Sequence, residues 1–86
     1  MTKSTTNLRP EHVEGARGML KMSQADLAKA SGVAKSTIED FESGKRVPRS
    51  DTLERLREAL ERRGIEFLYG ESPGVRLHPD KAVIHV

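Results

Sequence analysis

Residues 24–41 read QADLAKASGVAKSTIEDF, and their small, glycine and apolar residues fall at the spacing of two short helices joined by a tight turn. Ala28 is small where the two helices would approach most closely, and Gly32 is placed to end the first helix in a left-handed conformation. Three apolar side chains then face inward: Val33, Ile38 and Phe41. The stretch therefore predicts two helices that cross at a steep angle.

Such a crossing is the geometry of the DNA-binding helix-turn-helix, whose second helix enters a major groove. The segment 23–44, SQADLAKASGVAKSTIEDFESG, resembles the phage repressor and Cro family of helix-turn-helix proteins, also called the XRE family. The resemblance extends upstream to Pro10 and downstream to Ile65. It implies a repressor-like all-α domain that binds double-stranded DNA.

The sequence before this segment predicts a first helix over residues 10–20. Pro10 suits the first helical position, where its missing N–H is not needed. Gly15 and Gly18 weaken this helix by about 1 kcal/mol each relative to alanine, so tertiary packing has to hold it. Its inward face carries Val13, Ala16 and Leu20.

Capping signals delimit the next two helices. Ser23 caps the second helix, with Asp26 three residues later in a capping-box arrangement, and Gly32 ends it. The third helix is expected over residues 35–43, closed by Gly44.

A fourth helix and a hairpin complete the expected fold. Ser50 or Asp51 is expected to cap the helix, which ends at Gly64. From Ile65 the apolar period changes from helical to alternating, with the turn-like sequence GESPG between two runs, which predicts a β-hairpin. The inward stripe of the helix is Leu53, Leu56 and Leu60.

These elements divide the chain into four parts. We expect a flexible arm over residues 1–9, the helix-turn-helix domain over 10–64, a hairpin over 65–78, and a tail or third strand over 79–86. A lone hairpin is marginally stable and has two free edges, so we expect it to pack on the helices or to form a homodimer.

Composition excludes several classes of protein. The 86 residues include no cysteine, and no run approaches the roughly 20 apolar residues that span a bilayer, so we expect a cytoplasmic protein without a membrane segment. A cysteine nucleophile, a Walker glycine loop and an HExxH motif are all absent, so we expect neither an enzyme nor a cofactor. The histidines are scattered and predicted to lie on the surface: His12, His78 and His85.

The resemblance places base recognition in the first turns of the third helix. Lys35 suits guanine, Ser36 pairs with several bases, and the Thr37 methyl suits thymine. Acidic side chains there can accept from cytosine or remain solvated. The implied base-reading residues are Ala34, Lys35, Ser36, Thr37, Glu39 and Asp40.

Phosphate contacts are expected on both sides of that helix. The start of the second helix offers N–H donors and a positive dipole end, and in the family the residue matching Gln24 contacts phosphate. Ser43, with the N–H groups of Gly44 and Lys45, is expected to add neutral donors. The implied phosphate-binding residues are Ser23, Gln24, Ser43, Lys45, Arg46 and Arg49.

Arg17 and Glu42 match positions at which the family pairs an arginine of the first helix with a glutamate of the third. The resemblance implies a partly buried structural ion pair that fixes the orientation of the two helices.

The resulting functional hypothesis is a small sequence-specific transcriptional regulator, in the simplest case a repressor that occludes a promoter as a homodimer. An alternative stays open, because fold does not decide function. The same fold can serve as a protein-interaction module, such as an antitoxin bound to a toxin or a co-activator bound to the transcription machinery. Glu39 and Asp40 are acidic and lie on the expected base-reading face, which keeps the interaction-module hypothesis open. Lys35 and the basic loop, residues 45–49, favour DNA binding instead.

Overall fold

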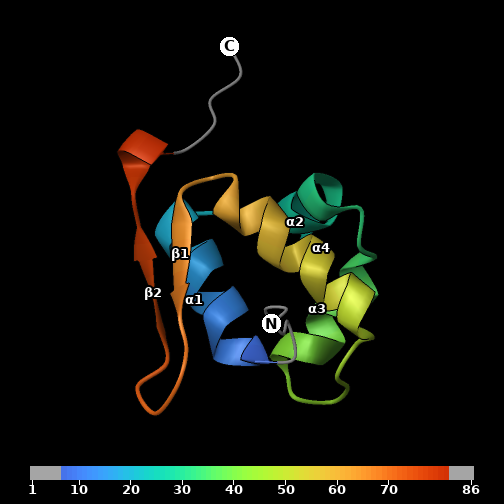
Figure 1. Ribbon diagram of the computed structural model, residues 1–86. Helices are drawn as coiled ribbons and strands as arrows, with labels where there is room; N and C mark the ends of the chain where they lie inside the picture. The colour runs from blue at the N-terminus through green and yellow to red at the C-terminus, as the bar shows by residue number, and fades with distance from the viewer. Residues whose placement is uncertain (1–6, 82–86) are drawn as a thin grey trace.

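The computed structural model describes residues 7–81, which form four helices followed by a two-stranded hairpin (Figure 1). The predicted fold class, an all-α helix-turn-helix domain with a small C-terminal hairpin, is confirmed. The elements are α1 (Pro10–Leu20), α2 (Gln24–Ser31), α3 (Lys35–Glu42), α4 (Ser50–Glu61), β1 (Ile65–Leu68), β2 (Gly74–Leu77) and a short 3-10 helix (Pro79–Lys81).

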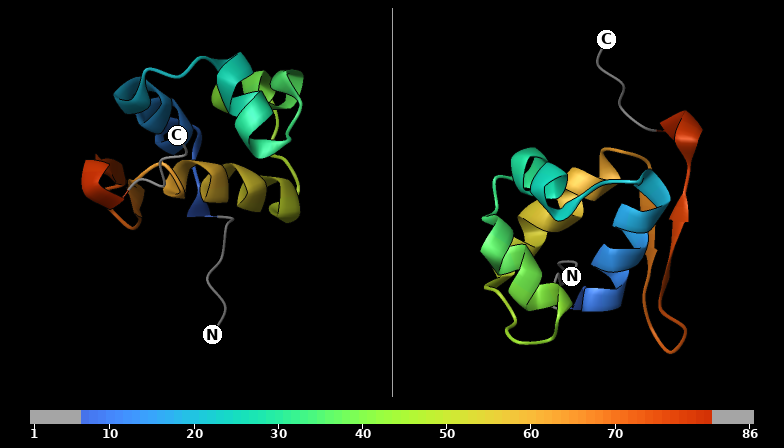
Figure 2. Two further views of the ribbon diagram at one scale, coloured as in Figure 1. Left: turned by 90° about the horizontal axis from the view of Figure 1, so that it is seen from above. Right: turned by 180° about the vertical axis from the view of Figure 1, so that it is seen from behind.

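The caps of α2 follow the sequence prediction. Ser23 Oγ accepts a hydrogen bond from the Asp26 N–H at 2.9 Å, and the Asp26 carboxylate accepts from the Ser23 N–H at 3.1 Å. Gly32 ends the helix with φ 76°, and its N–H donates to the Ala28 carbonyl at 2.9 Å. A left-handed residue at this point turns the chain directly into α3, which packs against α2 (Figure 2).

One apolar core lies between the four helices and the hairpin. The predicted inward residues are buried, apart from Leu20, which is half-buried and packs against the core. Leu27, Ala59 and Ile65 join them. The buried residues that the sequence predicted are Val13, Ala16, Val33, Ile38, Phe41, Leu53, Leu56 and Leu60.

Helix α4 begins differently from the prediction. Arg49 is its N-cap residue, with extended backbone, and its carbonyl accepts the Leu53 N–H at 3.0 Å. Ser50 is therefore the first helical residue, and the N-cap position belongs to Arg49, whose side chain makes no capping hydrogen bond, so the expected N-cap at Ser50 or Asp51 is wrong. Asp51 instead lies in the first turn, where its charge favours the positive end of the helix.

The hairpin covers one side of the helical domain. Its antiparallel register pairs Ile65 with Leu77 and Phe67 with Val75. Strand β2 lies against α1, and β1 lies against α4. Tyr69 follows the end of β1 rather than lying within it.

His12 is buried, at 1% exposed, so the prediction that it lies on the surface is wrong. Its Nδ1 accepts from the Arg9 N–H at 3.0 Å, and its Nε2–H donates to the Leu68 carbonyl at 2.8 Å. The ring also packs edge-on against Phe67 and Tyr69. A neutral imidazole satisfied at both nitrogens therefore ties the start of α1 to the hairpin.

The expected arm over residues 1–9 ends earlier than predicted. Leu8 is 3% exposed and belongs to the core, because it packs under the start of α1 instead of extending into solvent. Residues 79–81 of the expected tail or third strand form a 3-10 helix, while residues 1–6 of the expected arm and residues 82–86, with His85, lie outside the described residues. His78, also expected on the surface, is half-buried, with Nε2 2.6 Å from Oε1 of Glu66.

Candidate nucleic-acid interface

The first turn of α3 is exposed and has no side-chain cap. Ala34 is its N-cap residue, with extended backbone, and Ala34, Lys35 and Ser36 are exposed. Thr37 is half-buried, because the next residue, Ile38, is fully buried in the core. The uncapped, positive end of the helix dipole therefore faces outward beside short side chains, which suits a close approach to an anion or a base edge.

Lys35 is paired on the surface of α3. Its Nζ lies 3.1 Å from Oε2 of Glu39, and the two side chains are 55% and 47% exposed. An exposed pair at this spacing contributes only about 0.3–0.5 kcal/mol. Lys35 can therefore exchange Glu39 for a stronger acceptor at little cost.

The end of α3 folds back on itself. The Asp40 carbonyl accepts from the N–H groups of Lys45 and Arg46 at 2.8 and 3.2 Å, and Ser43 Oγ donates to it at 3.2 Å. The Gly44 N–H donates to the Phe41 carbonyl at 3.0 Å. The expectation that the Gly44 and Lys45 N–H groups bind phosphate is therefore wrong, because the turn that closes the helix already uses both.

Beyond that turn, the loop presents cations to solvent. Lys45 and Arg46 are exposed, and Arg49 Nη2 lies 3.4 Å from Oδ2 of Asp51, with side chains 86% and 61% exposed. Val47, between the cations, is 74% exposed. The weak Arg49 pair leaves the guanidinium available, so the loop can follow a phosphate backbone.

Arg17 and Glu42 form a bidentate pair between α1 and α3. Arg17 Nε donates to Oε2 and Nη2 to Oε1, both at 2.7 Å, while Nη1 donates to the Met22 carbonyl at 2.9 Å. The Glu42 side chain is 4% exposed and that of Arg17 is 19% exposed. The hydrogen bonds to Glu42 raise the pKa of Arg17, so this cation stays charged across the accessible pH range.

Gln24 joins that pair, a contact which sequence reasoning missed. Its Nε2 donates to Oε1 of Glu42 at 2.9 Å. No local pattern reveals this, since the residues are 18 positions apart and on different helices. The start of α2, where Ser23 is exposed, is thereby fixed relative to α3.

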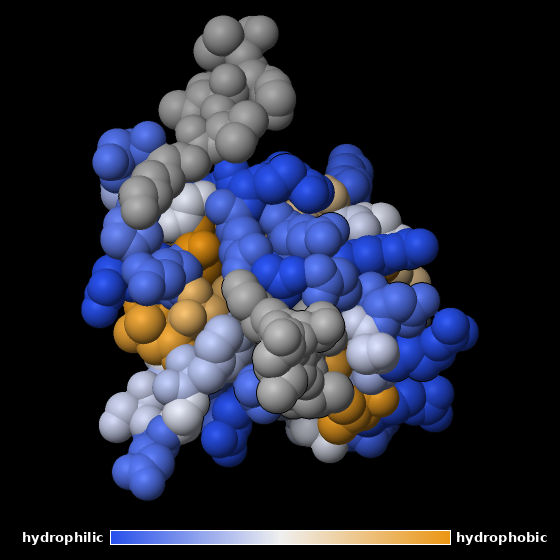
Figure 3. All heavy atoms as spheres, in the orientation of Figure 1, coloured by the Kyte–Doolittle hydropathy of each residue, from blue (hydrophilic) through white to orange (hydrophobic). Residues whose placement is uncertain are grey.

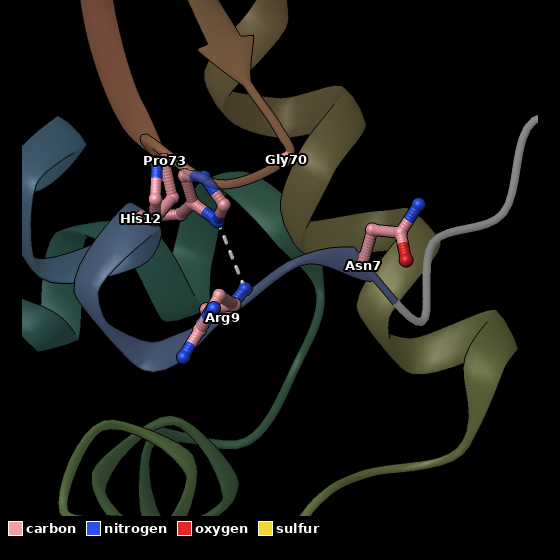
Figure 4. A pocket seen from close by; sticks show the side chains of 5 residues that line it. All are labelled: Asn7, Arg9, His12, Gly70 and Pro73. Carbon is pink, nitrogen blue, oxygen red and sulfur yellow. Dashed lines mark hydrogen bonds between the residues drawn. The ribbon is translucent and has the colours of Figure 1, made fainter.

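A hollow beside α1 holds a histidine that is already fully bonded. It measures about 360 Å³ and lies between the start of α1 and the hairpin tip (Figure 4). Both nitrogens of its one imidazole, His12, are bonded to backbone groups. Among residues 7–81, no group of three or more histidine, aspartate or glutamate side chains is arranged to hold a metal ion.

An exposed α3 that follows a capped α2 through a glycine turn, with a basic loop behind it, defines a helix-turn-helix DNA-binding domain. A family model described as helix-turn-helix matches residues 14–68, and the chain belongs to this XRE-type family of DNA-binding regulators. The match ends with β1, so β2 lies outside it. No curated protein matches the chain. None of the helices in the described part of the chain is long and apolar enough to cross a membrane.

Proposed function

We propose that this protein is a sequence-specific regulator that binds double-stranded DNA through α3 and represses transcription by occluding a promoter. The observation that carries the proposal is the exposed, uncapped start of α3 held on a rigid frame. Arg17, Glu42 and Gln24 hold three helices together at the other end of α3. A reading helix fixed in this way approaches a groove without first having to be ordered.

Base recognition is assigned to the exposed face of α3. Lys35 donates to guanine O6 and N7 once it leaves Glu39, Ser36 pairs with base edges, and the Thr37 methyl or hydroxyl contacts thymine or phosphate. Glu39 and Asp40 accept from cytosine or steer neighbouring cations. Ala34 admits the base edges because its side chain is small.

Phosphate contacts flank that face. Gln24 has a second amide N–H beside the one that binds Glu42, and Ser23 exposes its hydroxyl at the start of α2. The basic loop contributes the charged contacts, with Ser43 as a neutral neighbour. Neutralised phosphates release counterions, so binding should weaken steeply with added salt. The loop cations are Lys45, Arg46 and Arg49.

The proposed active form is a homodimer joined through residues 65–78. Within the described chain the sheet has two strands, and each leaves one edge unpaired. Val75 and Leu77 are only half-buried, and Figure 3 shows apolar side chains gathered along the hairpin. A two-fold dimer would place two α3 helices about 34 Å apart, one turn of DNA, and so requires a palindromic operator. Equilibrium sedimentation that finds only monomer at high concentration would contradict the dimer.

The experiment that tests the proposal is selection of bound duplexes from a random-sequence pool at physiological salt. A palindromic consensus supports the dimeric regulator and identifies its operator. An absence of enrichment leaves only electrostatic binding and favours the second candidate, a protein-interaction module such as an antitoxin or co-activator. The carboxylates of Glu39 and Asp40 on the reading face are the observation that favours this second candidate.

A further inference from the structure

A hollow of about 540 Å³ lies where the end of α1, the flank of α2 and the turn after α4 meet. No residue of α3 or of the basic loop lines it. None of the residues proposed to contact DNA therefore lines this surface, which adjoins the start of α2 through the hydrogen bonds between Asp26 and Ser23.

The floor of this hollow is apolar. Leu20, Met22 and Ala30 contribute to it, and all three are half-buried side chains packed against the core. Each thus leaves part of its apolar surface open to water, where a partner's apolar side chain would gain by covering it.

The rim is predominantly cationic. Lys21 and Lys29 are exposed, and Arg63 is half-buried, with Nη1 donating to the Ala59 carbonyl at 3.1 Å. That bond orients the guanidinium beside the hollow. Asp26 is the single anion among the lining residues, and its carboxylate is engaged by the Ser23 N–H. The rim therefore attracts carboxylates.

Lys21 is held in a strained conformation at this rim. Its φ of 56° makes it the one non-glycine residue in the left-handed region among residues 7–81. A residue with a Cβ is disfavoured there on steric grounds, which glycine would avoid. This conformation ends α1, where the Lys21 N–H donates to the Gly18 carbonyl at 3.2 Å, and it keeps Lys21 among the residues that line the hollow.

We propose that this hollow binds an acidic amphipathic segment of a partner protein, with carboxylates on Lys21, Lys29 and Arg63 and apolar side chains on the floor. Charge complementarity selects this occupant over a basic or uncharged one. Because α3 takes no part, the partner is able to bind the DNA-bound regulator. The docking itself does not depend on the function proposed above.

The test is an NMR titration of the ¹⁵N-labelled full chain with a synthetic peptide that carries leucines at helical spacing and glutamates elsewhere. A matched peptide with lysine in place of each glutamate is the control. We expect amide shifts confined to the hollow, and affinity reduced about tenfold in the double variant Lys21→Glu, Lys29→Glu, since two exposed attractions become repulsions. Lys29→Glu alone keeps the test independent of the strained turn.

A double variant with the same change of charge, Arg55→Glu on α4 and Arg62→Glu at the residue after it, both exposed and outside the hollow, should retain the parent's affinity for the peptide. Shifts elsewhere, equal binding of the lysine peptide, no binding at all, or an unchanged affinity in the hollow variants would overturn the proposal. So would a loss of DNA affinity in Lys29→Glu, because the hollow would then face phosphate. If the duplex selection finds no operator, the peptide titration still tests whether the hollow binds an acidic segment.

Discussion

Gln24, at the start of α2, donates a 2.9 Å hydrogen bond to the same carboxylate oxygen of Glu42 that accepts Arg17 Nη2 at 2.7 Å. One nearly buried carboxylate at the end of α3 therefore holds both α1 and α2. The arrangement joins a residue expected to contact phosphate to the pair expected to be structural. The Glu42 carboxylate therefore fixes the orientation of α3 relative to α1 and to the start of α2.

Arg17→Ala should destabilise the fold strongly. It removes the only cation bonded to Glu42 in the described chain and leaves a carboxylate 4% exposed without a counter-charge. Breaking a desolvated pair in this way costs about 3–5 kcal/mol. Urea unfolding measures the loss, with Arg55→Ala, an exposed change on α4, as the control. A melting temperature equal to the parent's would show that the pair is not structural.

The two glycines of α1 should respond differently to alanine. At Gly18 an added Cβ meets no atom within 4 Å. Gly18→Ala should therefore raise the free energy of unfolding by about 1 kcal/mol, the difference in helix propensity between the two residues. At Gly15 the Cβ would lie 3.3 Å from Val75 Cγ2, so the Val75 side chain has to move by a few tenths of an ångström and the gain should shrink or reverse. Urea midpoints of the two variants provide the measurement. Equal gains in stability for the two variants would mean that Val75 moves away from the added Cβ without a measurable energetic cost.

Lys35→Ala and Arg49→Ala should separate base reading from phosphate binding. The first should lose about 1–3 kcal/mol on the selected operator and relax the preference at one base pair. The second should weaken all sequences alike and reduce the salt slope by about one. Fluorescence anisotropy over single-base operator variants and a salt series distinguishes them. Equal losses on every sequence for both variants would remove the assignment of Lys35.

The cap of α2 should titrate in acid. Hydrogen bonds from the Ser23 backbone and side chain lower the pKa of Asp26 below its ordinary value. Because the folded pKa is the lower one, the cap stabilises fully above the unfolded pKa of about 3.9, and this contribution is lost as pH falls through the folded pKa. The amide shifts of Ser23 and Asp26, followed against pH, should move together in that range. Asp26→Asn should lack the step, and a step that survives in this variant would assign it to another group.

Local chemistry explains why most of the fold was predictable. The capping box at Ser23 and the left-handed turn at Gly32 involve residues only a few positions apart. The apolar period of α4 indicates which face of that helix is buried. The exposed side chains at the start of α3 follow from the same periodicity, because a helix that buries Ile38 and Phe41 has to turn Lys35 and Ser36 outward.

The failures at His12 and Leu8 have a common cause in tertiary packing, whereas the failure at Gly44 and Lys45 comes from a local turn. His12 was predicted to lie on the surface because the sequence does not show that β1 places the Leu68 carbonyl beside its ring. Leu8 was predicted to belong to the flexible arm, but it is buried in the core. The Gly44 and Lys45 N–H groups read as free donors until the closing turn of α3 uses them.

By itself, the sequence determined the helices, the caps of α2, the hairpin and the set of residues that face outward on α3, because propensity, capping and periodicity act between near neighbours in the chain. Only the tertiary structure decided that Gln24 shares the carboxylate of Glu42 with Arg17, that His12 fastens α1 to the hairpin, and that three cations surround an apolar hollow. These contacts join residues far apart in the sequence, and their distances depend on how whole helices pack.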